Sequence, residues 1–487
     1  MISKSFIKSS LLFTLGGALP MLAGISLLPF YTNYLSANNY TQLLFYISIS
    51  MLFQILFSFS IENYFGIRFT KLGDHPEEQK RFTGTVGVLL LLIGAMLLLF
   101  SALAGPLLFK SIYREDLGMS FWPCGFYSVL TGFFNAYFKA ASVCLIYLKR
   151  PFTFLISNVV NFILTVGISV GGLFLYPDSI LGPVYGRLFS GLAIFLIGLL
   201  VFRQNGRFVF DKSFLPELVS FCLPYLFYVL SGWVLMQVDR YILQAYIPNA
   251  ELNAYDLVLK CFYGIEFIQN SLSAVIYPKV YEIWSRESTA GTTPESNRYF
   301  NVLSALNVLQ LIVFCLLLPW VYRLFVHNSS FYAAESYIGI LAAGYALRSI
   351  MSFYLAGILF TSKVMVLVRI FAYSAILQIL MVWPASRYFG LEGAIYAGLF
   401  IKIIQVALCI LIGPSVFRYQ YNAYKILFLP LSYLLLNAGQ YLITGQYSVL
   451  FYALELLVFG LIIYLIFRNE IRKVMQNFGL LAKISSE

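Results

Sequence analysis

Charged residues are scarce in this sequence. Lys, Arg, Asp and Glu make up 11% of its 487 residues, and 60% of the residues are hydrophobic. Because soluble domains carry about a quarter charged residues, this composition excludes a soluble globular protein. We therefore expect an integral membrane protein.

Histidines are few, and neither paired cysteines nor nucleotide-binding motifs occur. The two histidines, His75 and His327, fall in predicted loops, so histidine acid–base chemistry inside the membrane is not expected. The six cysteines are scattered without a CxxC pair, which is typical of small buried residues rather than of disulfides or a metal site. No GxxxxGK[ST] motif occurs and no cofactor is expected. H⁺, Na⁺ and the membrane potential alone remain alternatives as the driving force.

Long apolar runs fill the chain instead. Dividing it wherever charge, Pro, Gly or polar clusters interrupt runs of about 20 apolar residues predicts an all-α membrane protein with about 14 transmembrane helices. The predicted spans are 11–32, 40–62, 83–105, 121–146, 152–176, 181–202, 215–246, 252–278, 301–322, 335–358, 364–384, 391–413, 422–442 and 447–467. The first is too long for the apolar core of a signal peptide, so we expect it to remain as a span. Divisions into twelve or thirteen spans are alternatives.

The distribution of Lys and Arg predicts the orientation of these spans, because cytoplasmic loops favour both residues. With the N-terminus inside, only four of the 32 lie in outer loops: Lys110, Arg114, Arg323 and Arg387. This bias predicts an even number of spans and both termini in the cytoplasm. It also explains the net charge of +11 without a nucleic-acid partner.

Six basic residues remain within the predicted spans: Lys139, Arg187, Arg240, Lys260, Arg348 and Lys402. A charge at the bilayer centre costs roughly 2.5–3.5 kcal/mol on insertion scales, so such residues are expected to face a cavity or a partner. Their excess over acids predicts a water-filled cavity of positive potential, in which Arg and Lys bind phosphate oxygens. The alternative is that each cation pairs with an acid or a carbonyl between helices.

Depth along the helices separates the candidates for substrate binding. Arg348 and Lys402 lie near the middle of their spans, where reaching an interface is hardest. Lys139, Arg187 and Lys260 lie farther from the centres of their spans. Because a helix rises about 1.5 Å per residue, these three are closer to a membrane interface than Arg348 and Lys402. These five are the predicted substrate-binding residues.

Acids are fewer at these depths. Asp256 lies four residues before Lys260, so the two can pair along one helix face. Farther along the same span, Glu266 begins a second polar stripe that runs to Ser273 and predicts a face bordering water. Glu266 is the candidate site for a proton or a coupling ion, and a buried, hydrogen-bonded glutamate is the alternative. Glu455 has no evident partner in the sequence.

Asp239 and Arg240 are adjacent in the apolar stretch SGWVLMQVDRYILQ, residues 231–244. Adjacent helical residues point about 100° apart, so the two side chains cannot both face one cavity. They fall in the outer third of their span. We interpret them as an outer-side gate or a helix-packing pair.

A short internal match indicates a repeat. GGALPML and SFCLPYL place Leu-Pro at 19–20 and again at 223–224, at similar depth in the first and seventh spans. Matched helix-breaking positions in two halves are a feature of alternating-access transporters. The expected domains are an N-terminal six-helix bundle at 1–210, a second at 211–420, and two further helices with a cytoplasmic tail at 421–487.

Two stretches resemble a known family. In residues 218–282 a Leu-Pro span ends in Asp-Arg-Tyr-Ile-Leu, and residues 11–71 hold two spans, the second leading into IENYFGIRF. Both resemble the polysaccharide-transporter family of bacterial O-antigen and capsule flippases, which belongs to the multidrug/oligosaccharidyl-lipid/polysaccharide exporter superfamily. Asp239 and Arg240 stand at family-typical positions.

The resemblance implies two six-helix bundles around a central cavity, plus two further helices. It implies a flippase that moves undecaprenyl-diphosphate-linked oligosaccharide repeat units across the bacterial inner membrane by alternating access, for O-antigen or surface-polysaccharide biosynthesis. The implied partners are this lipid-linked glycan, the lipid bilayer, a polysaccharide polymerase and a chain-length regulator.

Three other functions are alternatives. A lipid II flippase shares the superfamily, and so does a multidrug antiporter, although the basic excess disfavours a cationic drug. A membrane glycan polymerase or ligase is an enzyme that acts on the same lipid-linked substrate. Such enzymes usually carry a large outer loop, whereas the longest connection here, about 279–300, lies on the inner side.

Overall fold

Helices make up nearly all of the computed structural model, which describes residues 4–73, 75–207, 209–286, 291–361, 363–444 and 448–477. The predicted tail after residue 477 lies outside these residues. The described part of the chain contains no strand, only an isolated bridge between Gly291 and Arg418. The predicted all-α fold is confirmed.

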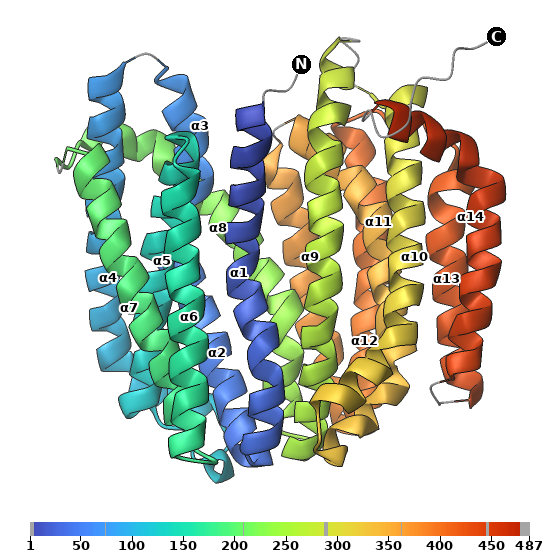
Figure 1. Ribbon diagram of the computed structural model, residues 1–487, viewed down its shortest axis with the longest axis horizontal. Coiled ribbons are helices and arrows are strands. Elements are labelled where there is room, and N and C mark those ends of the chain that lie inside the picture. Colours follow the sequence, from blue (N-terminus) through green and yellow to red (C-terminus); the bar gives the residue numbers. More distant parts are fainter. Residues whose placement is uncertain are drawn as a thin grey trace. The chain divides into compact units, whose positions relative to one another are not determined.

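The chain divides into two compact units, Met1–Ala245 (unit 1) and Tyr246–Glu487 (unit 2), whose helices are labelled in Figure 1. Unit 1 holds α1 (Lys4–Tyr34), α2 (Ala37–Ser58), α3 (Ile61–Lys71), α4 (Pro76–Ile112), α5 (Phe126–Tyr147), α6 (Pro151–Leu175), α7 (Leu181–Asn205) and α8 (Leu215–Leu243). Unit 2 holds α9 (Asn249–Arg286), α10 (Pro294–Phe325), α11 (Ile338–Phe360), α12 (Val364–Ile412), α13 (Ala423–Thr444) and α14 (Val449–Asn477). The predicted division into 1–210, 211–420 and 421–487 instead places α8 in the second six-helix bundle. This division into three parts stays a prediction.

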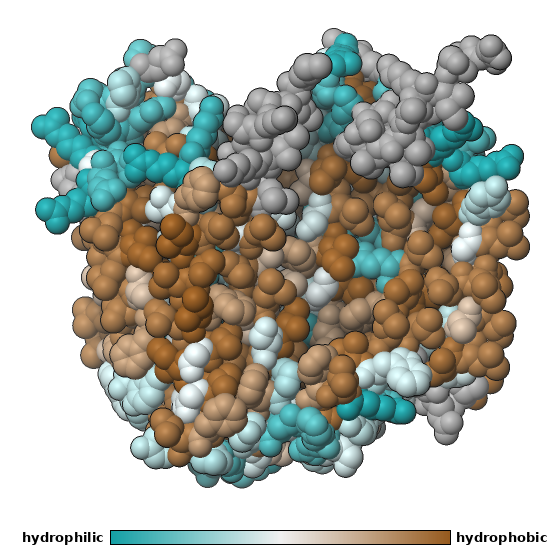
Figure 2. Space-filling model, viewed as in Figure 1, coloured by the Kyte–Doolittle hydropathy of each residue, from teal (hydrophilic) through white to brown (hydrophobic). Residues whose placement is uncertain are grey.

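Twelve segments of the described chain are long and apolar enough to cross a membrane. Two features account for the difference from the predicted fourteen. α12 covers the spans expected at 364–384 and 391–413, with a break at Gly390, whose φ is +57°. α9 covers the span expected at 252–278, but polar residues recur along it and it is not among the twelve. In the view of Figure 2, hydrophobic side chains cover most of the middle of the helices of each unit, as expected for lipid contact.

Close backbone contact holds parts of unit 1 together. α6 packs against α1 and α7, and α5 packs against α2 and α7. Where α6 meets α7, a Cβ added at Gly172 would lie 2.4 Å from the Cα of Gly182. Small residues at such crossings are typical of membrane helices, where van der Waals packing between backbones drives association.

α2 ends earlier than predicted. A span was expected at 40–62, but the helix ends at Ser58, and Phe59 and Ser60 both adopt left-handed backbone angles, with φ of 47° and 57°. Such angles cost roughly 1–2 kcal/mol per residue for residues other than glycine. The break starts a new helix, α3, and places Glu62 in its first turn.

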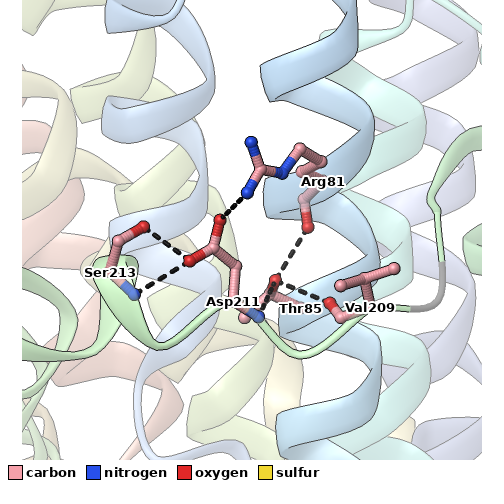
Figure 3. Close-up of polar contacts among 5 residues, drawn as sticks. All are labelled: Arg81, Thr85, Val209, Asp211 and Ser213. Carbon is pink, nitrogen blue, oxygen red and sulfur yellow. Dashed lines mark hydrogen bonds and ion pairs between the residues drawn. The ribbon is translucent and has the colours of Figure 1, made fainter.

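A polar network ties the connection between α7 and α8 to α4 (Figure 3). Arg81 donates to Asp211 Oδ2 at 2.6 Å, and the backbone N–H and hydroxyl of Ser213 donate to Asp211 Oδ1 at 2.9 and 2.7 Å. The Thr85 hydroxyl accepts from the Asp211 backbone N–H at 3.2 Å and lies 3.0 Å from the Val209 carbonyl oxygen. The connection is therefore held at fixed points along α4.

Candidate functional site

A polar cavity of about 280 Å³ lies within unit 1, between α1, α2, α5, α6 and α7. It brings together two of the predicted substrate-binding residues, Lys139 from α5 and Arg187 from α7. Amide and hydroxyl side chains supply most of the other polar lining: Gln54, Asn135, Asn158, Asn161, Thr131, Ser142, Thr165 and Ser190. The cavity therefore offers hydrogen-bond donors and acceptors from several helices, together with two cationic side chains.

Lys139 is paired with an acid that was not anticipated. Its Nζ lies 2.7 Å from Oε1 of Glu62, whose side chain is 6% exposed, while that of Lys139 is 45% exposed. The sequence placed Glu62 in the last turn of a span rather than at the start of α3, so no pairing was evident. The pair offsets one of the two positive charges of the cavity.

Arg187 differs from Lys139 in lacking an acidic partner in the described part of the chain. Among the described residues no acid forms a salt bridge with it, and its buried Nε forms no hydrogen bond. Beside it, Thr165 donates to the Ser190 hydroxyl at 2.7 Å, and Ser190 can donate to the Arg187 carbonyl oxygen at 3.2 Å. An unpaired guanidinium in a polar cavity is suited to bind an anion through paired N–H groups.

Arg348 and Glu266, predicted as a substrate ligand and a coupling-ion site, contact each other in unit 2. Arg348 Nη1 lies 2.7 Å from Glu266 Oε1, and Nη2 donates to Asn270 Oδ1 at 2.8 Å. The two side chains are 24% and 23% exposed. Their charges offset each other, which agrees with the alternative that each cation within the spans pairs with an acid. The roles of Arg348 in substrate binding and of Glu266 in ion coupling stay predictions.

Lys260 and Lys402 also have partners. Lys260 Nζ lies 2.5 Å from Asp256 Oδ2, the pairing that the four-residue spacing predicted. Lys402 Nζ lies 4.3 Å from the ring centre of Tyr345, a cation–π contact between α12 and α11. Tyr345 in turn stacks on Phe262 of α9, with ring centres 4.9 Å apart.

Asp239 and Arg240 are both buried in unit 1. Arg240 is 1% exposed, its Nη1 lies 3.3 Å from Asp239 Oδ1, and it also donates to the carbonyl of Met236. Asp239 Oδ1 accepts the Arg240 backbone N–H at 2.9 Å. This burial favours the helix-packing role over the gate, and both stay predictions.

Glu455 has a partner that the sequence did not reveal. Asn437 Nδ2 on α13 donates to Glu455 Oε1 on α14 at 2.7 Å. The two residues lie on different helices, so no periodicity connected them. Over the described part of the chain, no three His, Cys, Asp or Glu side chains gather as metal ligands.

Solved membrane transporters share this fold. The lipid II flippase MurJ, in an inward closed conformation, is 15% identical, with 97% of this chain and 98% of that chain covered and a TM-score of 0.65. An inward-facing multidrug resistance MATE family transporter of the MOP superfamily is 13% identical over 83% of this chain and 93% of that chain, with a TM-score of 0.61. The Vibrio cholerae MATE transporter VcmN is 15% identical over 88% and 98%, with a TM-score of 0.56. At these identities the likeness shows an all-α transporter fold and no more.

Comparison of sequences identifies the family of this chain. No curated protein matches the chain. The family model described as polysaccharide biosynthesis protein matches residues 6–284, more than half of the chain, and this stretch includes Glu62, Lys139 and Arg187. The chain therefore belongs to the polysaccharide biosynthesis protein family, and it is a multi-pass membrane transporter, as the resemblance implied.

Proposed function

We propose that this transporter is a flippase that moves undecaprenyl-diphosphate-linked oligosaccharide repeat units across the bacterial inner membrane, for O-antigen or another surface polysaccharide. It works by alternating access, with both termini in the cytoplasm. A polysaccharide polymerase and a chain-length regulator then act on the units it delivers.

The main observation that supports this proposal is the polar cavity of unit 1. Its amides and hydroxyls match the hydroxyl groups of sugars, and the rings of Phe138 and Phe154 in its wall offer apolar surface to a sugar face. Arg187 adds a cation that no acid offsets among the described residues, which suits a phosphate and opposes a cationic drug. At about 280 Å³ the cavity is close to the lower limit of ligand pockets, about 300 Å³, so it holds part of a headgroup rather than a whole repeat unit.

Substitution of Arg187 tests this function. In a strain that lacks the chromosomal gene, Arg187→Ala is expected to reduce surface polysaccharide about 10- to 100-fold, since hydrogen bonds to charged groups contribute about 1.5–3 kcal/mol. Arg187→Lys, which keeps the charge and loses the paired geometry, is expected to retain an intermediate level. Arg203→Ala removes an exposed arginine from the last turn of the same helix and serves as the matched control. Normal polymer in the Arg187→Ala strain, at normal protein level, would contradict the proposal.

Transport in liposomes separates this substrate from its rivals. Purified protein is given either the undecaprenyl-diphosphate oligosaccharide or lipid II, which shares the diphosphate, and the headgroup that reaches the opposite leaflet is measured. Transport of lipid II alone would assign the lipid II flippase function. Elongation or ligation of the glycan without translocation would assign an enzyme instead.

A further inference from the structure

Glu455 is a buried acid in the apolar helix α14. The residue is 5% exposed, and no Lys or Arg in the described ranges forms a salt bridge with it. α14 packs chiefly against α10, whereas α13 packs chiefly against α11. The hydrogen bond from Asn437 to Glu455 is therefore a direct polar link between two helices that mainly pack elsewhere.

Two oxygen atoms of this link have no partner among the residues that the structure describes. Asn437 is fully buried, and its Nδ2 donates to Glu455 Oε1 at 2.7 Å and to the Tyr433 carbonyl at 3.1 Å. Asn437 Oδ1 and Glu455 Oε2 are both buried and form no hydrogen bond with any described residue. Both atoms are acceptors when Glu455 is a carboxylate, so they cannot bond to each other.

We propose that Glu455 and Asn437 form a proton-binding site between α13 and α14. One proton on Glu455 Oε2 converts that atom into a donor to Asn437 Oδ1, which closes a ring of two hydrogen bonds between a carboxylic acid and an amide. The same proton satisfies both orphaned atoms and removes the charge from the lipid-embedded helix pair. This site does not depend on which lipid-linked substrate is transported.

The groups near Glu455 favour a proton as its ligand, because none of them can neutralise the carboxylate. Cys315 of α10 and Tyr433 of α13 lie near it, and their Sγ and Oη atoms are 3.6 Å apart. Tyr452 of α14 approaches the site beside Gly339 of α11, where an added Cβ would lie 2.5 Å from its Oη and 3.4 Å from Asn437 Oδ1. A thiol and two phenols lose their protons at higher pH than a carboxyl group, and none of them supplies a positive charge.

The test follows thermal unfolding of the purified full-length protein in lipid nanodiscs from about pH 5 to pH 9, the range in which buried carboxyl groups lose their protons. The wild-type midpoint is expected to fall as the pH rises, because loss of the proton opens the ring. Glu455→Gln places an amide N–H where the acid O–H stood. We expect this variant to unfold at least as high as the wild type and without that fall. Glu295→Gln, which alters an exposed acid in the first turn of α10, is the matched control and keeps the wild-type fall.

Infrared difference spectra over the same pH range give a second readout. The wild type is expected to show a carbonyl band of a buried carboxylic acid at low pH, and Glu455→Gln is expected to lack that component. If the Gln variant does not fold, Glu455→Asp is used instead, and its band is expected to shift because the shorter side chain draws the acid away from Asn437. A wild-type midpoint independent of pH, or an unaltered fall in Glu455→Gln, would overturn the proposal. So would a rise in the midpoint with Na⁺ at constant pH that requires Glu455, because it would assign the site to a metal cation.

Discussion

Gly84 on α4 lies against the backbone of the chain that follows α7. A Cβ added there would lie 1.7 Å from the carbonyl oxygen of Arg207, a backbone atom that cannot turn aside. We expect Gly84→Ala to lower the free energy of unfolding by about 1–3 kcal/mol, the usual cost of overpacking. The measurement is the midpoint of thermal unfolding in nanodiscs. Gly167→Ala on α6 adds the same methyl group with nothing within 4 Å of it, so equal midpoints for the two variants would show that the close approach is absent.

Some pairs of charged residues could be predicted from the sequence, and others could not. The pair Asp256–Lys260 could be predicted because helical periodicity brings residues four apart onto one face. The pair Glu62–Lys139 could not, because it joins two helices and depends on the break between α2 and α3. Arg187 was one of five predicted cavity residues, and only tertiary packing shows that, in the described chain, it lacks the acidic partner that Lys139 has.

The connection between α7 and α8 yields a prediction about pH. Hydrogen bonds from Ser213, followed by the charge of Arg81, hold the pKa of Asp211 below its ordinary value of 3.8. A carboxyl whose pKa is lowered by folding stabilises the folded state above its unfolded pKa, and this contribution is lost as the pH falls through the folded pKa. We therefore expect the amides of segment 209–214 to lose protection against hydrogen exchange below about pH 4 in the wild type, measured relative to the intrinsic exchange rate at each pH.

Asp211→Asn is expected to show this loss of protection already at neutral pH, because it removes the ion pair with Arg81 shown in Figure 3. The matched control is Asp116→Asn, which removes an acid paired with Arg114 in a different connection and should leave segment 209–214 unchanged. Slow exchange in Asp211→Asn would show that the backbone contacts alone hold the connection.

Whole helices were easier to predict than their breaks. Apolar runs indicated where the chain crosses the membrane, because about 20 apolar residues are needed for each crossing. The break after Ser58 has no Gly or Pro to indicate it, so the predicted span ran on to residue 62. The turn at Gly390 was predicted as a boundary between two spans, and the structure continues both arms as α12.

The orientation of the whole molecule depends on charge. Of the four basic residues in predicted outer loops, Arg114 pairs with Asp116 and Arg323 with Glu335. The bias counts Lys and Arg rather than net charge, so these acids leave it unchanged. The orientation itself stays a prediction, because helices of this length and composition can cross a membrane in either direction.

Cysteine accessibility in intact cells tests that orientation. Two exposed serines of unit 2 form a matched pair, Ser329 in the short helix η4 (Ser329–Tyr337) and Ser415 in η5 (Gly413–Ser415). An impermeant maleimide is expected to label Ser329→Cys in intact cells and Ser415→Cys only after permeabilisation, because the charge bias places the first outside and the second inside. The wild-type chain supplies the background, since five of its six cysteines are buried and Cys261 is partly buried. Labelling of Ser415→Cys alone in intact cells would invert the orientation, and with it the direction in which the proposed flippase faces its substrate.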